Sequence, residues 1–466
     1  MLVRVRIAPS PTGEDLHVGN IYTGLINWVF AKKNKGKFIV RIEDTDRTRL
    51  VEGSEQRILS SLKKFSLNYD EGVDVGGPFA PYRQSERREI YTKYAMELIE
   101  KGAAYYCYCS PEKIQEIKSK QGNVFKRHIN FCDSPKKETF VIRLKVPDNK
   151  DITFNDLIRG KITINTDQVD DQILIKSDGF PTYHMAVVVD DHLMEISHVI
   201  RADEWISSTP KHVLIYEAFG WQMPLHAHVP LLRNSDKSKL SKRSNPVWAS
   251  WYLEQGFLPE AMLNYLALMG WSHPEGKEIF GIDEFVEKFD LVDLKPVGPV
   301  FDLIKLEWMN GEYIRKMSDE NLEKRLDEFL VDHPSKGKLK PLIPLVKDRI
   351  KKLSDFIHLT CFFFEEAEYD KEIFNKLKIE KINDVLSKVL ESLEGMQKSW
   401  ENQVFEANFR KLAEQLGLSA SQMFQLIRVS ISGQTVTPPL FESIKILGEE
   451  ETKSRVKASL EFLSGS

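Results

Sequence analysis

Two short segments, far apart in the chain, carry residue types that can bind phosphate. The first is the turn at residues 9–13 (PSPTG), which is followed by His17, Gly19 and Asn20 at the start of a helical pattern. Proline fixes the backbone angle φ, and glycine lets a ligand approach the main chain closely. Side chains and free N–H groups at the start of a helix can together surround a phosphate. We therefore expect a nucleotide here, with Gly19 leaving room for its adenine or ribose.

The second segment is a polar loop at residues 233–243 (RNSDKSKLSKR), which contains Lys239 and Lys242. Their ammonium groups can neutralise a triphosphate and the charge that builds on departing pyrophosphate. Each segment alone has an ordinary alternative, because a lone His-x-Gly-Asn can be a solvated loop and a basic run is usually solvated. Together, in this order, the segments favour one ATP site in which His17 and the two lysines converge on a single triphosphate.

The elements around the first segment predict a parallel sheet. Residues 3–7 alternate between apolar and charged side chains as a strand does, residues 21–36 show helical spacing, and residues 37–42 have the pattern of a second strand. Such a unit places nucleotide chemistry at the strand ends. Residues 72–180 mix turns with short strand-like runs, and the pattern resumes at residues 181–190. We therefore expect an α/β fold, a Rossmann-like parallel-sheet domain with an inserted α+β domain.

Long helical patterns dominate after residue 317, for example at residues 345–364, 385–393 and 405–416. Glycine and proline become sparse there, which favours helices over turns. We place a domain boundary near residue 320, so that residues 1–320 form a catalytic region and residues 321–466 an all-helical C-terminal region.

Composition and charge narrow the class of protein. The chain has 466 residues, of which 42% are hydrophobic and 29% charged, as in an ordinary soluble enzyme of more than one domain. Its net charge of −4 means that a nucleic-acid partner would need a local basic face. We expect a cytoplasmic protein, because no apolar run could span a bilayer and the N-terminus lacks the apolar core of a signal peptide. Four cysteines are too few for a disulfide framework at this length.

Several motifs give the chain a specific resemblance to a known family. They lie at residues 6–13 (RIAPSPTG), 41–46 (RIEDTD), 180–184 (FPTYH), 199–205 (VIRADEW), 239–243 (KLSKR) and 438–442 (PPLFE). In this order and spacing the chain resembles the bacterial glutamyl-tRNA synthetases, which are class I aminoacyl-tRNA synthetases, and the likeness covers nearly the whole chain. The resemblance implies that ATP and L-glutamate form glutamyl-adenylate with release of pyrophosphate. The glutamyl group then passes to the 3′-terminal adenosine of tRNA(Glu).

The resemblance also implies roles for the regions and the partners. Residues 72–180 would bind the acceptor end of the tRNA, residues 240–320 would contact its stem, and residues 321–466 would bind the anticodon. ATP would bind together with Mg²⁺, no membrane would be involved, and we expect a monomer. Whether tRNA(Gln) is charged as well stays open.

The resemblance assigns ATP contacts to residues in and between the two segments. The implied ATP-binding residues are Ser10, Thr12, Gly13, His17, Gly19, Asn20, Glu204, Leu232 and Lys242. His17 and Asn20 would hold the phosphates while Lys239 and Lys242 steady the pyrophosphate, and these four are the implied catalytic residues. Asn20 stands where many class I enzymes have a second histidine, but its amide can still donate a hydrogen bond.

The glutamate site implied by the resemblance is built around guanidinium groups. Its residues are Arg6, Ala8, Ser10, Glu43, Tyr183 and Arg201. A guanidinium recognises a carboxylate through paired charged hydrogen bonds, so Arg6 would bind the substrate's side-chain carboxylate with Arg201 as its helper. Glu43 suits the α-ammonium group, and Trp205 would lie beside nucleotide and substrate. Val187 departs from relatives that carry asparagine there, which removes one polar contact.

A metal site is a further expectation from the resemblance, because Cys107, Cys109 and Cys132 are similar to a zinc site that some relatives carry. Zinc requires four ligands, and the usual fourth position falls near Ser134, which is a poor ligand. His128 or Asp133 could replace it. The alternative is a group of reduced cysteines packed in a small β region, and both interpretations stay open here.

Other interpretations have specific difficulties. A glutaminyl-tRNA synthetase shares the chemistry, but Arg6 favours an anionic side chain and the helical C-terminal pattern differs from that enzyme's β-barrels. A shorter paralogue that glutamylates a modified tRNA base lacks an anticodon domain, whereas this chain continues for residues 321–466. A non-catalytic tRNA-binding regulator should have lost His17 or the lysine loop.

The basic run at residues 347–352 could contact tRNA phosphates, but most such runs are solvated helix faces, and no anticodon-reading residue is assigned.

Overall fold

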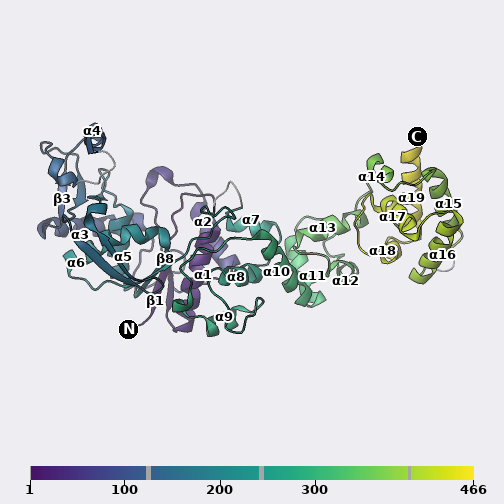
Figure 1. Cartoon of the computed structure of the whole chain (residues 1–466), viewed down its shortest axis with the longest axis horizontal. Coiled ribbons are helices and arrows are strands. Elements are labelled where there is room, and N and C mark those ends of the chain that lie inside the picture. Colours follow the sequence, from purple (N-terminus) through teal and green to yellow (C-terminus); the bar gives the residue numbers. More distant parts are fainter. Residues whose placement is uncertain (1, 122–126, 241–245, 397–399, 466) are drawn as a thin grey trace. The chain divides into compact units, whose positions relative to one another are not determined.

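The computed structural model describes residues 2–121, 127–240, 246–396 and 400–465. Contacts divide the chain into two compact units. The first comprises Met1–Glu254 and Pro259–Leu306, and the second comprises Gln255–Leu258 and Glu307–Ser466. Figure 1 shows the elements of both, and each unit is described by itself.

The predicted strand–helix–strand unit begins the chain. It consists of β1 (Arg4–Ile7), α1 (Val18–Lys33) and β2 (Lys37–Val40), and the two strands pair in parallel over their whole length. Every residue of β1 is buried. The connection into β2 is tight at Gly36, where a Cβ atom would lie 2.3 Å from the carbonyl oxygen of Val3. Only glycine therefore lets the chain turn from α1 back beside β1.

A separate four-stranded sheet begins beside β1. Ser197 N–H, next to β8 (His198–Ala202), donates to Arg4 O at 3.0 Å, so β1 and β8 begin side by side. Next come β9 (Leu225–Val229), parallel to β8, then β5 (Asp151–Asp156), parallel to β9, and finally β6 (Gly160–Asn165), antiparallel to β5. Two strands of the inserted segment thus join the edge of the parallel sheet.

The rest of the inserted segment forms a small antiparallel sheet covered by helices. Its strands are β3 (Ala104–Cys107), β4 (Val141–Leu144) and β7 (Ile173–Ile175), in the order β3-β4-β7. Helices α3 (Arg88–Glu100) and α5 (Tyr183–Leu193) pack on this sheet, α6 (Thr209–Phe219) packs on β5, and α4 (Pro111–Gln121) follows β3 in the insert. Tyr91, Leu174, Val188 and Ile215 share one apolar core, so the insert and the resumed βα pattern pack as one body. Figure 1 shows β3 and α4 at one end of this unit.

Further helices complete the first unit and lead out of it. They are α2 (Ser54–Lys64), α7 (Ala249–Glu254), α8 (Pro259–Ala267), α9 (Ile282–Lys288) and α10 (Leu303–Lys316). The last of them, α10, crosses the division between the two units.

All described regular elements of the second unit are helical, which confirms the predicted all-helical C-terminal region. They are α11 (Asp319–Phe329), α12 (Ile343–Val346), α13 (Ser354–Thr360), α14 (Lys371–Lys376), α15 (Ile382–Glu394), α16 (Asn402–Gln415), α17 (Ala420–Ser432), α18 (Leu440–Leu447) and α19 (Glu449–Ser464). Together with the parallel sheet of the first unit, they confirm the predicted fold class.

One expected helix is broken. The helical pattern at residues 345–364 is divided into the end of α12, then α13, and then a 3₁₀ turn at Cys361–Phe363. The carboxylate of Asp355 accepts N–H groups from Lys351 and Lys352, at 2.8 and 3.0 Å. It satisfies main-chain donors in the turn that precedes α13, where the pattern predicted one continuous helix.

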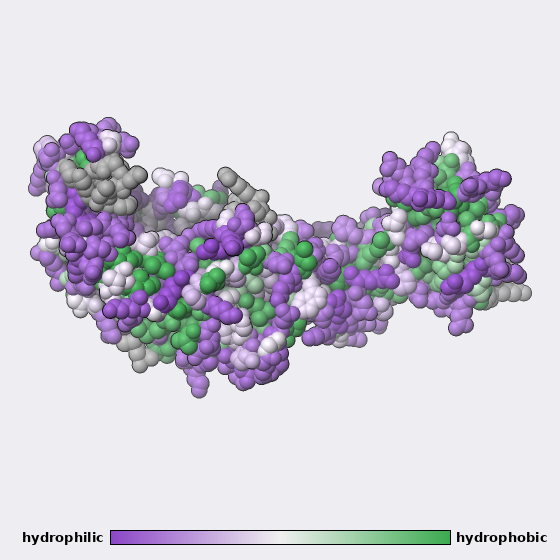
Figure 2. All heavy atoms as spheres, viewed as in Figure 1, coloured by the Kyte–Doolittle hydropathy of each residue, from purple (hydrophilic) through white to green (hydrophobic). Residues whose placement is uncertain are grey.

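Hydrophilic residues cover most of the face seen in Figure 2, with smaller hydrophobic areas among them. Among the described helices, none combines the length and the apolar character that a bilayer crossing requires.

Candidate functional site

His17 caps the helix that begins the first segment. Its backbone is extended, and its ring atom Nδ1 accepts the N–H of Gly19 at 2.9 Å. Because Nδ1 acts as an acceptor, the neutral ring carries its proton on Nε2. The imidazole thereby caps the first turn of α1.

A pocket lies in front of this helix start. Its lining comes from α1, from the ends of β8 and β9, and from the beginning of the lysine loop. The lining residues are His17, Gly19, Asn20, Tyr22, Thr23, Ala202, Glu204, Pro230, Leu231, Leu232, Lys239 and Leu240. His17 and Lys239, which are more than 200 residues apart in the chain, therefore line one pocket, as the sequence predicts.

The start of the lysine loop is fixed at the pocket. Leu240 N–H donates to Leu232 O at 3.0 Å, and the Asn234 amide donates to Lys239 O at 3.1 Å. The Lys239 ammonium lies 2.5 Å from Glu204 Oε2. Lys242, the other predicted catalytic lysine, lies outside the described residues.

The chain returns from the lysine loop to the base of α1. Val18 N–H donates to Val247 O at 2.7 Å, and Ala249 N–H donates to Leu16 O at 2.9 Å. Between these two bonds lies Trp248, and a Cβ atom on Gly13 would come within 2.7 Å of its indole. Gly13 is therefore needed for the tight packing of the turn against Trp248. Leu240 and Val247, on either side of residues 241–245, are thus both held by main-chain hydrogen bonds.

Not all predicted ATP residues lie in this pocket. His17, Gly19, Asn20, Glu204 and Leu232 line it together with Lys239. In the described part of the pocket, the lining does not include Ser10, Thr12 or Gly13. Those three belong to the turn that leads toward α1.

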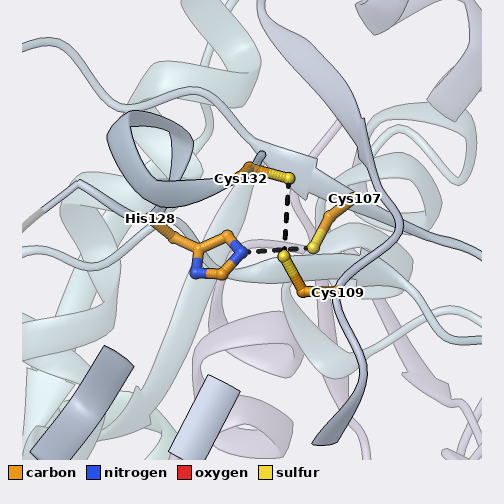
Figure 3. A group of neighbouring side chains, drawn as sticks. All are labelled: Cys107, Cys109, His128 and Cys132. Carbon is orange, nitrogen blue, oxygen red and sulfur yellow. Dashed lines mark hydrogen bonds between the residues drawn. The ribbon is translucent and has the colours of Figure 1, made fainter. Parts of the chain in front are cut away.

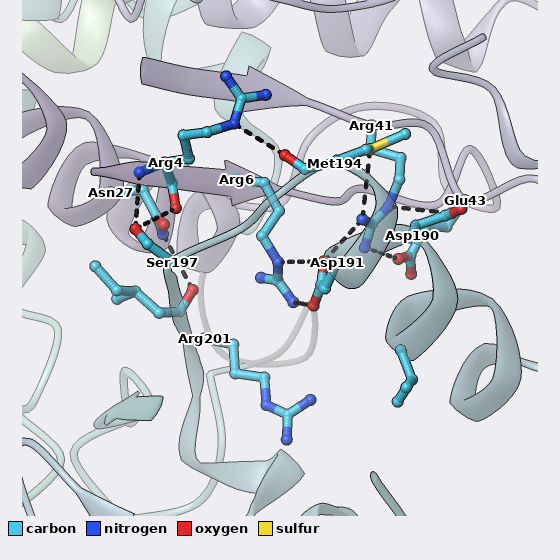
Figure 4. Close-up of polar contacts among 12 residues, drawn as sticks. Arg4, Arg6, Asn27, Arg41, Glu43, Asp190, Asp191, Met194, Ser197 and Arg201 are labelled. Carbon is cyan, nitrogen blue, oxygen red and sulfur yellow. Dashed lines mark hydrogen bonds and ion pairs between the residues drawn. The ribbon is translucent and has the colours of Figure 1, made fainter. Parts of the chain in front are cut away.

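A second group of predicted residues surrounds a buried arginine, Arg6. Its guanidinium makes two bonds to Asp191, from Nε to Oδ1 at 3.0 Å and from Nη2 to Oδ2 at 3.1 Å. Asp191 also accepts from Arg41 at 2.8 Å, and Arg41 contacts Glu43 at 3.2 Å, as Figure 4 shows. Burial would raise the pKa of Asp191, but the charges of Arg6 and Arg41 outweigh it and hold that pKa below its usual value. The Arg6 charge is therefore already balanced by a carboxylate.

Arg201 differs from Arg6 in that its partners are all neutral. Nε donates to His228 Nε2 at 3.1 Å, Nη2 to Thr209 Oγ1 at 2.9 Å, and Nη1 to Tyr183 Oη at 3.2 Å. A second Nη1 contact reaches His212 Nδ1 at 3.3 Å. Within the described part of the chain, no carboxylate pairs with Arg201, although its side chain is 95% buried.

The remaining predicted glutamate residues lie around these arginines. Arg201, Glu43 and Arg6 all act electrostatically on the Tyr183 hydroxyl, whose pKa burial raises. The Tyr183 ring lies against Trp205, with centroids 4.2 Å apart. Burial raises the pKa of Glu43 to about 7, against the opposing charges of Arg41 and Arg6.

Ala8 and Ser10 continue the chain beyond β1, and Pro9 O between them accepts Glu43 N–H at 3.0 Å. Val187 is buried in the core of the insert, so this position offers an apolar contact and no polar one.

Sequence reasoning missed several residues at these sites, among them Arg41, Asp191, Tyr22 and Thr23. For Asp191 a signal existed, because an Asp-Asp pair directly follows three valines in a helix. Acids inside an apolar run are rarely buried without a partner. Tyr22 and Thr23 lie within the helical pattern of α1 and gave no comparable signal.

The cysteines of the insert form a compact cluster with a histidine, shown in Figure 3. Cys107 Sγ lies 3.2 Å from His128 Nε2, and Cys109 Sγ lies 3.9 Å from Cys132 Sγ. All four ligand atoms lie within 4.8 Å of one another, a spacing that suits one tetrahedral ion. His128 occupies the fourth place. Asp133 instead pairs with Lys113 at 3.8 Å.

Comparison with known proteins agrees with both units. A family model described as tRNA synthetases class I (E and Q), catalytic domain, matches residues 2–308, and one described as anticodon binding domain matches residues 320–460. A glutamate–tRNA ligase of Acidothermus cellulolyticus is 44% identical, covering 98% of this chain and 95% of that protein. One of Thermus thermophilus is also 44% identical, covering 98% of this chain and 100% of that protein.

A solved structure agrees as well. The crystal structure of a glutamate tRNA ligase from Elizabethkingia meningosepticum in complex with its amino acid superposes with a TM-score of 0.84 at 35% identity. The match covers 99% of this chain and 100% of that one. The chain therefore belongs to the glutamate–tRNA ligase family of class I tRNA synthetases.

Proposed function

We propose that this protein ligates L-glutamate to tRNA(Glu) in two steps. ATP and glutamate first form glutamyl-adenylate with release of pyrophosphate, and the glutamyl group then moves to the 3′-terminal adenosine of the tRNA. The observation that carries the proposal is the shared position of His17 and Lys239 in one pocket. Ala202, which also lines that pocket, directly follows Arg201 on β8, so the proposed nucleotide and glutamate sites adjoin along one strand.

The first step asks mainly for positioning and charge stabilisation. A carboxylate oxygen of glutamate attacks the α-phosphorus in line, and the bond to pyrophosphate breaks. His17 Nε2–H and the Asn20 amide donate to the phosphates, while the start of α1 offers further N–H groups. Mg²⁺ bound with ATP supplies additional positive charge to the triphosphate.

Lys239 and Lys242 stabilise the departing pyrophosphate. Lys242 is the second residue after Leu240, a reach of about 7 Å at full extension. Leu240 lines the pocket. The Lys239–Glu204 ion pair is partly exposed, so a triphosphate can displace the carboxylate from the ammonium group. Ser10, Thr12 and Gly13 complete the nucleotide side by shaping the turn before α1.

Glutamate recognition divides between the two arginines in a way that the sequence did not predict. Arg201, which has neutral partners only, supplies the charge for the side-chain carboxylate, and Tyr183 adds its hydroxyl proton. Arg6, already balanced by Asp191, takes the helper role. Glu43 binds the α-ammonium group, with Ala8 and Ser10 beside it.

The roles of the regions follow from the family. We assign residues 72–180 to the acceptor end, residues 240–320 to the stem, and residues 321–466 to the anticodon, within a catalytic region at residues 1–320. We also propose a cytoplasmic monomer, which light scattering of the purified chain would check. Charging of purified tRNA(Glu) and tRNA(Gln) side by side tests whether the enzyme accepts tRNA(Gln) as well.

Replacing Lys242 by alanine should lower glutamate-dependent ATP–pyrophosphate exchange by about 10²-fold, because one ammonium no longer stabilises the leaving group. The assay contains tRNA and measures label entering ATP. Lys237→Ala is the matched control in the same loop, and it should keep the exchange rate. Full activity of Lys242→Ala would contradict the assigned role.

The ionisation of Glu43 predicts a pH dependence. Its pKa is raised to about 7, so the carboxylate is protonated below that pH and loses its attraction for the α-ammonium group. In the acid range kcat/KM for glutamate should fall about tenfold per pH unit, and it should level off above the pKa. Glu43→Gln should be low and flat over the same range. The same acid limb in Glu43→Gln would assign it to another group.

We further propose that Cys107, Cys109, Cys132 and His128 bind one zinc ion, which would fix the β3 end of the insert. Support comes from the two pairs of ligand atoms at 3.2 and 3.9 Å, which match the ligand spacing around tetrahedral zinc. Elemental analysis of the purified chain should find one zinc per molecule. Cys109→Ser should lose it, whereas Cys361→Ser in the second unit should retain it. Metal-free wild-type protein with an unchanged thermal midpoint would favour packed, reduced cysteines.

A further inference from the structure

Arg201 is held by a hydrogen-bond chain that the proposed reaction does not itself use. His228 Nε2 lies 3.1 Å from Arg201 Nε, and His228 Nδ1 lies 2.7 Å from Asp156 Oδ2. Asp156 and Arg201 are at most 5% exposed, and His228 is completely buried. We propose that Asp156 and His228 are positioning residues that set how Arg201 presents its donors to the substrate carboxylate. The inference rests on the proposed function, in which Arg201 binds that carboxylate.

The donor and the acceptor of each hydrogen bond from Arg201 through His228 to Asp156 are fixed. An arginine can only donate, so His228 Nε2 accepts and its proton resides on Nδ1, from which it is donated to Asp156. Asp156 can only accept, because Oδ1 takes the N–H groups of Ile158 and Arg159 at 3.0 Å each and Oδ2 takes the His228 N–H at 3.0 Å. Burial lowers the pKa of His228, which favours the neutral ring that this arrangement requires.

The imidazole positions the guanidinium without cancelling its charge. Asp191 contacts Arg6 directly and balances it, as a carboxylate placed against Arg201 would also do. Here a neutral ring separates Asp156 from Arg201, so Arg201 receives an acceptor while its positive charge stays available for an anion. Burial makes that charge more effective toward an incoming carboxylate than it would be in water.

The same hydrogen bonds leave Arg201 and Tyr183 with hydrogen-bond donors for the substrate carboxylate. Arg201 has five N–H hydrogens, and His228, Thr209, Tyr183 and His212 accept four of them, which leaves one. Tyr183 accepts from Arg201 through its oxygen, so its own proton is free to be donated. Two donors therefore remain for a substrate. A carboxylate can accept both, whereas the amide of glutamine would turn N–H groups toward one of them.

His212 is a second neutral imidazole that accepts a hydrogen bond from Arg201. Its Nδ1 accepts from Arg201, so its Nε2–H donates to His184 Nδ1 at 3.1 Å. Burial lowers the pKa of His184 to about 3 and that of His212 well below the usual value, so both rings stay neutral. The described surroundings of Arg201 therefore offer acceptors to it and no directly paired anion.

The variant Asp156→Asn should reverse the direction of the hydrogen bond between residue 156 and the His228 ring. With the amide oxygen opposite the Ile158 and Arg159 N–H groups, the NH₂ group faces His228 Nδ1 and also the main-chain N–H of His228, which Oδ2 accepts in the wild type. Nδ1 then becomes an acceptor, and the proton moves to Nε2, where it faces the Arg201 Nε–H. Two opposed donors push Arg201 from its position. We expect KM for glutamate to rise at least about tenfold, with KM for ATP and the exchange kcat within about twofold.

The test measures exchange kinetics with glutamate, glutamine and ATP for wild type, Asp156→Asn and His228→Phe. The discrimination between glutamate and glutamine should fall at least about fivefold in both variants. His226→Phe is the matched control, since His226 lies on the same strand and bonds Pro224 O rather than Arg201. Unchanged KM for glutamate in the folded variants, or an equal rise in KM for ATP, would overturn the positioning role.

A second measurement does not depend on the variants folding. The nitrogen shifts of His228 in the labelled wild-type chain should show a protonated Nδ1 and an unprotonated Nε2, and the opposite tautomer would overturn the inference. Failure of the proposed function has a different signature, because wild-type protein would then show no glutamate-dependent exchange at all.

Discussion

Replacing Arg201 by leucine should lower kcat/KM for glutamate by about 10³-fold in the exchange assay while leaving KM for ATP within about twofold. Arg201 is 95% buried and carries the one guanidinium of this site, in the described chain, that lacks a carboxylate partner. Its removal takes away the charge that the substrate carboxylate pairs with. It also leaves Tyr183, Thr209 and His228 without their donor, so the cavity that remains is poorly suited to any polar substrate.

Lysine variants separate the roles of the two arginines. Arg6→Lys keeps a cation beside Asp191, so we expect only a modest rise in KM for glutamate. Arg201→Lys loses the fork that contacts several acceptors at once, and its loss should approach that of Arg201→Leu. Arg83→Leu, which removes a partly exposed pair with Glu55, serves as the control for general arginine loss. A larger effect for Arg6→Lys than for Arg201→Lys would restore Arg6 as the main recogniser of the carboxylate.

Replacing Asp190 by alanine should destabilise the first unit by about 3–5 kcal/mol. The carboxylate is completely buried, and it accepts from Arg87 at 2.7 Å, from Gln84 at 2.8 Å and from Tyr91 at 2.8 Å. Through these bonds it joins α5 to α3 and to the 3₁₀ turn at Gln84–Arg87. Its loss leaves a buried guanidinium without its anion, which costs more than the missing bonds alone.

Thermal unfolding followed by circular dichroism measures this effect as a lower midpoint. Asp46→Ala is the matched control, because Asp46 pairs with Arg49 at 2.6 Å where both side chains are exposed. An exposed pair contributes about 0–1 kcal/mol, so that midpoint should barely move. Equal shifts for the two aspartates would mean that burial of Asp190 does not carry the stability assigned to it.

The elements that depend on the spacing of apolar residues within a short stretch could be predicted from the sequence. β1, α1 and β2 are determined by apolar alternation, helical spacing and a turn glycine within about 40 residues, and the structure places them as expected. The meeting of His17 with Lys239 was predicted from the order of two motifs. It depends on the chain after β9 bringing Leu232 and Leu240 to the start of α1, where the strands of a parallel sheet end.

What the sequence could not supply depends on contacts between distant segments. Asp191 is 185 residues from Arg6, and nothing near either residue reveals that the pair neutralises Arg6 and leaves Arg201 as the free charge. His128 was one of two candidates for the fourth cysteine-cluster position, since the fold of a loop decides which side chain arrives. The broken helix at residues 345–364 depends on Asp355 satisfying two main-chain N–H groups, which a helical pattern does not report.

The central claim is that one enzyme site joins ATP chemistry at His17 to glutamate held by Arg201. The most direct test is pyrophosphate exchange by the wild-type chain with tRNA present, with each amino acid supplied alone. Glutamate should support exchange and glutamine should not, and His17→Ala should abolish the signal. Exchange supported by another amino acid but not by glutamate, or undiminished exchange by His17→Ala, would contradict the account.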